Sequence, residues 1–193
     1  MTKSTFVPLL GLFTAAYMVL VGTFALGASV KAYSAGPDPA ITGGFTESTC
    51  AQSGCHNSFE ANAGKASKLG DVVIEGLPKQ YEPGKTYPVK LTVTHTQGRM
   101  YWGFQLAARL KATGAQAGAL KPADGKTQIV DEKGIQYLEH TLEGIETNTF
   151  TFDWTAPSST AGEVVVDAAG NAADGDGGSM GDYIYTTSVA IPE

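Results

Sequence analysis

The sequence is poor in charge, in cysteine and in histidine. Of its 193 residues, 17% are charged, two are cysteine and three are histidine. The formal net charge is −6, which argues against a nucleic-acid partner because phosphate binding needs a basic face. No Ser-His-Asp arrangement and no pair of carboxylates stands out, so we do not expect an enzyme. After the first thirty residues no stretch has the 3.6-residue period of a long helix, which leaves a β-rich domain as the expectation.

One long apolar run lies at the N-terminus. It extends from Phe6 to Ala28 without a charged residue. A helix of about 20 apolar residues crosses the hydrocarbon layer, whereas the apolar part of a cleaved signal peptide has about 7–15 residues. Ala25-Leu26-Gly27 approximates a cleavage site, so a long signal peptide is the alternative. We predict that residues 1–29 form a single transmembrane anchor in the cell membrane, with the folded domain on the periplasmic or extracellular side.

The rest of the chain divides into three parts. Residues 30–49 are rich in Gly, Pro, Ser and Thr and are typical of an irregular linker. Residues 50–70 contain both cysteines, and residues 71–193 contain short alternating runs separated by turn residues. Seven to nine such runs at intervals of about 10 residues predict an antiparallel β-sandwich.

Two runs alternate most clearly, 87–96 and 148–155. The first is followed closely by another alternating run, 100–111, and this spacing predicts a hairpin between the two. Pro83-Gly84 suits the centre of a type II turn. The predicted core comprises Val89, Leu91, Val93, Phe104, Leu106, Phe150, Phe152 and Trp154.

The segment Cys50-Ala-Gln-Ser-Gly-Cys55-His56 contains the most specific chemistry. In c-type haem attachment two thiols form thioether bonds to the haem, and the histidine after the second thiol ligates iron. We therefore predict haem c bound through Cys50 and Cys55, with His56 as the proximal ligand. The usual spacing has two residues between the cysteines, and here there are four. The alternative is a Cys50–Cys55 disulfide with His56 as a surface residue; a zinc site would need a further ligand from elsewhere.

A six-coordinate haem would need one more ligand. The candidates are His140 first, His95 second, and Met100 and Met180 after them.

Several ordered segments resemble the bacterial Reeler-like domains called choice-of-anchor V. The resemblance covers about residues 40–190 and rests on TESTCAQSGCH, YEPGKTYPVKLTVTH, YWGFQLAARL, YLEHT, FDWTAPSSTAGEVVVDAAGNAADGDG and GDYIYTTS. It implies an immunoglobulin-like sandwich similar to the extracellular Reeler domain. It also implies a haem-type motif at Cys50, Cys55 and His56, and it assigns no reaction.

Two functions from different classes follow. The first is a membrane-anchored mono-haem c-type cytochrome that carries electrons, alone or as a subunit of a larger respiratory or photosynthetic membrane complex. Its partners would be the bilayer and a redox protein or complex. The alternative is a haem-free accessory subunit with a Cys50–Cys55 disulfide, whose β-sandwich binds a membrane protein complex.

Overall fold

The computed structural model describes Met1, residues 33–52 and residues 55–193. The predicted membrane anchor at residues 6–28 lies outside the described residues. Within the described part of the chain, no helix is both long enough and apolar enough to cross a membrane.

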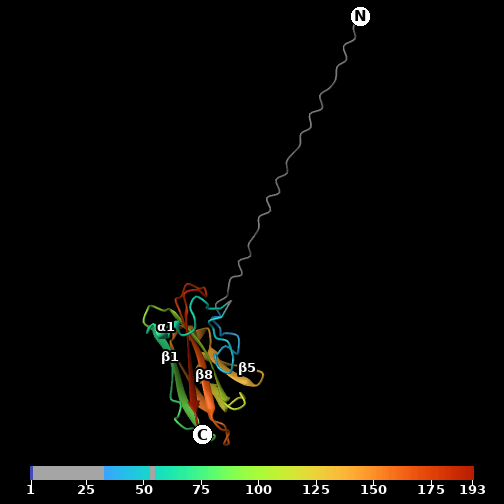
Figure 1. Cartoon of the computed structure of the whole chain (residues 1–193), viewed down its shortest axis with the longest axis vertical. Coiled ribbons are helices and arrows are strands. Elements are labelled where there is room, and N and C mark those ends of the chain that lie inside the picture. The colour runs from blue at the N-terminus through green and yellow to red at the C-terminus, as the bar shows by residue number, and fades with distance from the viewer. Residues whose placement is uncertain (2–32, 53–54) are drawn as a thin grey trace.

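In the described part of the chain, nine strands form two antiparallel sheets that face each other as a sandwich (Figure 1). The first sheet has the order β1-β2-β7-β4 and the second the order β5-β6-β3-β8-β9. The prediction of an all-β antiparallel sandwich is confirmed. The strands are β1 (Gly70–Glu75), β2 (Thr86–His95), β3 (Tyr101–Leu110), β4 (Ala119–Pro122), β5 (Thr127–Glu132), β6 (Ile135–His140), β7 (Thr149–Thr155), β8 (Val164–Ala173) and β9 (Tyr183–Ile191).

Among residues 33–52 and 55–193, two short helical segments lie outside the sheets, α1 (Ala63–Ala66) and the 3-10 helix η1 (Glu143–Glu146). The loop from Asp174 to Asp182 and α1 lie at one end of the sandwich, and the C-terminus lies at the other (Figure 1). Gly84 has a φ of 72°, and the Lys85 N–H donates to the Glu82 carbonyl at 3.1 Å. This geometry is the predicted type II turn, whose third position needs a positive φ.

The core lies between the sheets. Each predicted core residue is at most 3% exposed, and Trp154 is fully buried. Alternation places these side chains inward because successive residues of a strand point to opposite faces. On β7 the outward positions are held by threonine and aspartate, which suit a solvated face.

The predicted hairpin between residues 87–96 and 100–111 is wrong. β2 pairs with β1 and β7, whereas β3 pairs with β6 and β8. The segment between β2 and β3 crosses from one sheet to the other, so the apolar faces of the two strands meet across the core. Both arrangements bury the same alternate residues, and the alternation therefore does not distinguish them.

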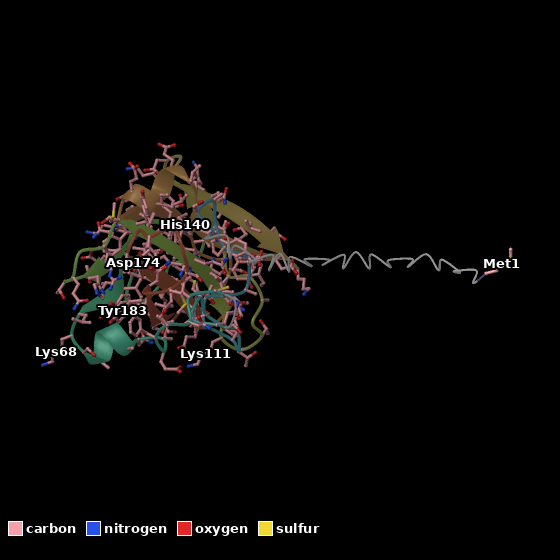
Figure 2. The ribbon with its side chains drawn as sticks, turned by 90° about the horizontal axis from the view of Figure 1, so that it is seen from above. Met1, Lys68, Lys111, His140, Asp174 and Tyr183 are labelled. Carbon is pink, nitrogen blue, oxygen red and sulfur yellow. The ribbon has the colours of Figure 1, made fainter. Side chains whose placement is uncertain are left out.

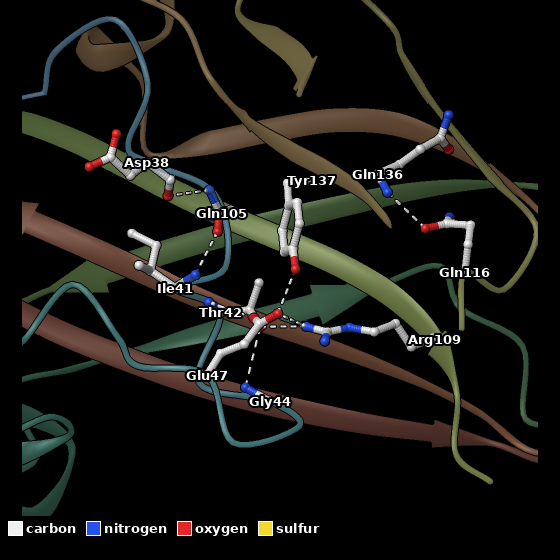
Figure 3. Close-up of polar contacts among 10 residues, drawn as sticks. All are labelled: Asp38, Ile41, Thr42, Gly44, Glu47, Gln105, Arg109, Gln116, Gln136 and Tyr137. Atoms are coloured by element: carbon white, nitrogen blue, oxygen red, sulfur yellow. Dashed lines mark hydrogen bonds and ion pairs between the residues drawn. The ribbon is translucent and has the colours of Figure 1, made fainter. Parts of the chain in front are cut away.

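β3 is also buried on its second face, from Gly103 to Arg109. Residues 33–49, which we call the N-terminal strap, lie against this outer face of the second sheet. The Ile41 N–H donates to Gln105 Oε1 at 2.9 Å, and Gln105 Nε2 donates to the Asp38 carbonyl at 3.0 Å (Figure 3). The backbone of the strap is irregular, as its composition predicted, but its polar contacts attach it firmly to the sheet.

The strap is also fixed by a buried ion pair. Arg109 Nη2 lies 2.5 Å from Glu47 Oε1, and their side chains are 6% and 10% exposed (Figure 3). The Tyr137 hydroxyl donates to the same carboxylate at 2.6 Å, and the Thr42 hydroxyl donates to its other oxygen at 2.5 Å. Burial, followed by its hydrogen bond to Glu47, raises the pKa of Tyr137. The phenol therefore stays protonated and remains a hydrogen-bond donor to the carboxylate.

Candidate functional site

A cavity of about 480 Å³ opens at the end of the sandwich that carries the 174–182 loop. Figure 2 shows the domain from this end, with His140 and Asp174 labelled. The walls come from the start of the strap, the Cys-His segment, the first residues of β3, and the ends of β6 and β8. These segments are distant in sequence and meet here because the strands that carry them end at the same edge.

The cavity wall is mainly apolar. Its aromatic side chains are those of Tyr33, Tyr101, Trp102 and Phe104, and Leu142 adds an aliphatic side chain. Phe104 also belongs to the central core, so the floor of the cavity is continuous with the core of the domain. Among the described lining residues there is no lysine and no arginine.

His56 lies in the wall between two polar partners. Its Nδ1 is 2.6 Å from Asp182 Oδ2, within ion-pair distance although not aligned as a hydrogen bond. Asn171 Nδ2 lies 3.3 Å from His56 Nε2. Because an amide nitrogen only donates, Nε2 accepts, and in the neutral ring the proton sits on Nδ1, the nitrogen beside Asp182. Both ring nitrogens therefore face protein groups.

His140 is held in the same way from another side of the cavity. Its Nδ1 accepts from the Phe104 N–H at 3.1 Å, and its Nε2 donates to the Tyr33 carbonyl at 3.2 Å. Burial, more than any other cause, lowers the pKa of His140, so its ring is neutral at pH 7. A Cβ at Gly103 would come 2.8 Å from the ring, so the ring occupies the space that a side chain at position 103 would take.

The two cysteines are free thiols with different surroundings. Cys50 lines the cavity and packs in a small cluster with Ile41, Ala169 and Ile184. Burial, and then the neighbouring Cys55, raises the pKa of Cys50 to about 12. Cys55 is half-buried and is not part of the cavity wall. The His56 N–H donates to the Cys50 carbonyl at 3.0 Å, so the two ends of the loop are held together.

The sequence-predicted site residues are only partly brought together. Cys50, His56 and His140 line one cavity, and the role of His140 as a distal haem ligand stays a prediction. His95 lies elsewhere, with its Nδ1 2.5 Å from the Tyr185 hydroxyl and its ring against Tyr183. The other candidates, Met100 and Met180, are 61% and 59% exposed and do not line the cavity.

Asp182 and Asn171 were not identified from the sequence. Asp182 is 1% exposed and ends the acidic, glycine-rich loop, which resembles a flexible polar turn in composition. Asn171 lies on β8, among small residues that gave no signal of a site. In the sequence, Asn171 and Asp182 differ from their surroundings only in being polar residues next to mainly apolar strands.

The fold and the cavity define a class, an antiparallel β-sandwich with an apolar cavity at one end. A family model described as the Reeler domain matches residues 48–170, more than half of the chain. The chain therefore belongs to the Reeler domain family.

Several solved structures are similar to the chain, and no curated protein matches it. The human F-spondin reeler domain is 22% identical over 65% of this chain and 88% of that chain, with a TM-score of 0.48. A cohesin module of a Clostridium perfringens family 33 glycoside hydrolase is 10% identical over 64% of this chain and 96% of its own, with a TM-score of 0.45. The collagen-binding domain of a Staphylococcus aureus adhesin is 8% identical over 65% of this chain and 97% of the adhesin domain, with a TM-score of 0.37.

The predicted function of a mono-haem electron carrier is wrong. The family that matches is that of the Reeler domain, and in the described residues no three His, Cys, Asp or Glu side chains are grouped to hold a metal ion. The ring nitrogens of His56 and His140 contact protein groups. Cys50 is a buried, protonated thiol. The predicted attachment of haem through Cys50 and Cys55 stays a prediction, and the findings support the haem-free alternative better.

Proposed function

We propose that this Reeler domain is a haem-free, non-catalytic binding module outside the cytoplasm, which docks through its cavity-bearing end onto a membrane protein complex. We also place the chain in the choice-of-anchor V branch of Reeler-like domains, on the motifs that it shares with them. The single observation that carries the docking proposal is the distribution of exposed apolar side chains.

Large apolar side chains that are exposed gather at one end of the domain. In the described residues there are eight such side chains, and only Met1 and Val73 lie elsewhere. Contiguous exposed apolar surface of this kind marks interaction sites. We call this surface the apolar end; it comprises Tyr33, Phe59, Met100, Tyr101, Leu142 and Met180.

Contacts connect these residues to the same edge of the sandwich. The Phe59 ring stacks on Tyr183 at the start of β9, with 4.2 Å between centroids. The Met180 sulfur lies 3.6 Å from the Ser58 hydroxyl oxygen. The remaining members of the apolar end either line the cavity or, in the case of Met100, donate a backbone N–H to Ala173 at the end of β8.

The charge beside the apolar end favours a protein partner over an anionic lipid surface. Glu143, Glu146, Asp174 and Asp176 border it, and the first two and the last are exposed. Arg99, next to Met100 in the chain, is already engaged: its Nη1 donates to the Gly181 carbonyl at 3.0 Å. On this acidic side, an apolar partner surface with a basic border is complementary and anionic headgroups would be repelled. The exposed Lys65 and Lys68 lie on the other side of the end, at α1 (Figure 1).

The predicted anchor supports the orientation of this end toward the membrane. Tyr33 in the cavity wall follows Ala28, the last residue of the apolar run, by five positions in the sequence. Even a fully extended chain of this length spans only about 17 Å. A domain anchored by residues 6–28 therefore keeps its apolar end near the bilayer, where a membrane protein can meet it.

Site-specific photo-crosslinking tests this function. p-Benzoylphenylalanine placed at Leu142, which is 60% exposed, should join the full chain to a membrane polypeptide in native membranes. The same probe at Val73, 44% exposed on β1, is the matched control and should give no such adduct. Leu142→Asp should remove co-migration with that polypeptide on a native gel, and Val73→Asp should not. Adducts to lipid alone, or equal adducts at both positions, would overturn the proposal.

The cysteine pair belongs to the same proposal as a disulfide formed after export. Two thiols would lose two protons and two electrons to a disulfide-donating oxidant, leaving one S–S bond. The less buried Cys55 would attack first, since the Cys50 thiol has a raised pKa and reacts slowly as a nucleophile. The bond would close the loop whose ends the backbone already holds together.

A further inference from the structure

We propose that the cavity is a binding site for a neutral, flat, mainly apolar small molecule that carries one N–H or O–H donor. This proposal concerns the interior of the cavity and goes beyond docking at its rim, although the rim and the cavity wall share Tyr33, Tyr101 and Leu142. The volume of the cavity, about 480 Å³, is in the range of small-molecule sites, which are about 300–1,000 Å³.

The shape and chemistry of the wall set the body of the ligand. The aromatic side chains of Tyr33, Tyr101 and Trp102, together with Leu142, offer apolar contact area, and the buried Phe104 lies at the floor of the cavity. Glycines of the 174–182 loop, including Gly175 and Gly177, leave part of the wall without side chains. Aromatic walls favour flat ring systems, because stacked and edge contacts add to the burial of apolar area.

The charges of the wall exclude an anionic ligand at neutral pH. None of the described lining residues is a lysine or an arginine. Burial lowers the pKa of His140, and His56 is already beside the Asp182 carboxylate. A sulfonate, phosphate or carboxylate inside the cavity would therefore be desolvated without a cationic partner, at a large cost in binding free energy.

One acceptor in the wall lacks a partner. Asn171 lines the cavity, and its Oδ1 is buried without a hydrogen-bond partner in the described part of the chain. Its other amide atom, Nδ2, is directed to His56. Unsatisfied buried acceptors are rare in folded proteins. Oδ1 is shielded from the open cavity, so a small rotation of the Asn171 side chain would be needed for a ligand N–H or O–H to reach and satisfy it.

N-Phenyl-1-naphthylamine is a suitable probe, because it is neutral, consists of flat aromatic rings and has a single N–H. Native mass spectrometry of the full chain released from detergent should show one bound molecule per chain. Each comparison is made within one ligand, so that partition of that ligand into detergent is the same on both sides. Leu142→Asp should weaken binding at least about tenfold by placing a charge at the mouth. Val73→Asp, the matched control away from the cavity, should leave the affinity unchanged.

Two further comparisons test the donor and the charge. Asn171→Leu should weaken the amine about fivefold, the loss of one neutral hydrogen bond, and should leave 1-benzylnaphthalene, which has CH₂ in place of N–H, unaffected. The sulfonated analogue 1-anilinonaphthalene-8-sulfonate should not bind the wild-type chain and should bind Leu142→Lys.

Binding of several molecules per chain, or binding insensitive to Leu142→Asp, would overturn the site. Equal effects of Asn171→Leu on both neutral ligands would overturn the assigned donor contact, and sulfonate binding to the wild-type chain would overturn the exclusion of anions. Crosslinking at Leu142 does not depend on any of these results, so failure of the docking function is recognised separately.

Discussion

Glu47→Gln should destabilise the domain strongly, because it leaves a buried cation without its partner. The Arg109 side chain is 6% exposed and pairs with Glu47 at 2.5 Å. Removing one partner of a buried ion pair costs about 3–5 kcal/mol, since the remaining charge stays desolvated. Asp167 also interacts electrostatically with Arg109, which favours the lower end of this range. At about 2–4 °C per kcal/mol for a domain of this size, the melting temperature should fall by about 10 °C.

The matched control is Glu163→Gln. Glu163 pairs with Lys111 at 3.0 Å, but these side chains are 34% and 61% exposed. Exposed pairs contribute at most about 1 kcal/mol, so this variant should melt close to the wild type. The assay is circular dichroism of the full chain during heating, together with urea titration at 25 °C.

A double variant separates the cost of the unpaired charge from the loss of packing. Glu47→Gln combined with Arg109→Met removes both charges and keeps an amide oxygen that can accept from the Tyr137 and Thr42 hydroxyls. This double variant should recover most of the stability lost in Glu47→Gln alone. The reasoning is refuted if Glu47→Gln melts as Glu163→Gln does, or if the double variant is less stable than the single one.

Three other changes test separate parts of the structure. Trp154→Ala should lower the free energy of unfolding by about 3–5 kcal/mol in urea titrations. The reason is that the Trp154 side chain is fully buried and its Nε1–H donates to the Ala117 carbonyl at 3.0 Å. A decrease of less than about 1 kcal/mol would contradict its place in the core. His140 has a lowered pKa in the folded state, so the unfolded chain binds the proton first as the pH falls. The free energy of unfolding should therefore decrease as the pH drops below about 6.5. In urea titrations at pH 7.5 and pH 5, His140→Gln should remove that part of the decrease. Intact-mass spectrometry of the exported protein should show a mass two hydrogens below that of the reduced chain, for a Cys50–Cys55 disulfide; an added haem mass would contradict the haem-free function.

Local patterns in the sequence predicted the strands well and their pairing poorly. The alternation of 148–155 identified β7 and its buried side chains, because the period of two is a property of each strand alone. The partner of each strand depends on the whole topology. For that reason β2 and β3, adjacent in sequence, were assigned to one hairpin although they lie in different sheets.

The candidate site shows the same division. The sequence singled out Cys50, His56 and His140 by residue type, and all three line the cavity. The contact between His56 and Asn171 spans 115 positions, and nothing near either residue indicates it. The strap was missed as a structural layer for a similar reason. Its glycines and prolines predict irregular backbone correctly, but whether irregular backbone is free or packed depends on the surface it meets.

The position of the strap determines how the domain would respond to mechanical load. A pull applied at Tyr33, the first residue of the strap, is transmitted along the strap to Glu47 and Arg109, near the far end of the central strand β3. The strap crosses the face of the sheet and does not form a ladder of backbone hydrogen bonds with any strand of the described chain. Its contacts to the sheet would therefore break one after another under load, whereas the hydrogen bonds between two strands loaded in shear break together. Tyr33, whose carbonyl meets His140, would detach first and remove one wall of the cavity while both sheets remain intact. Tension from the membrane side would thus open the cavity before it unfolds the sandwich.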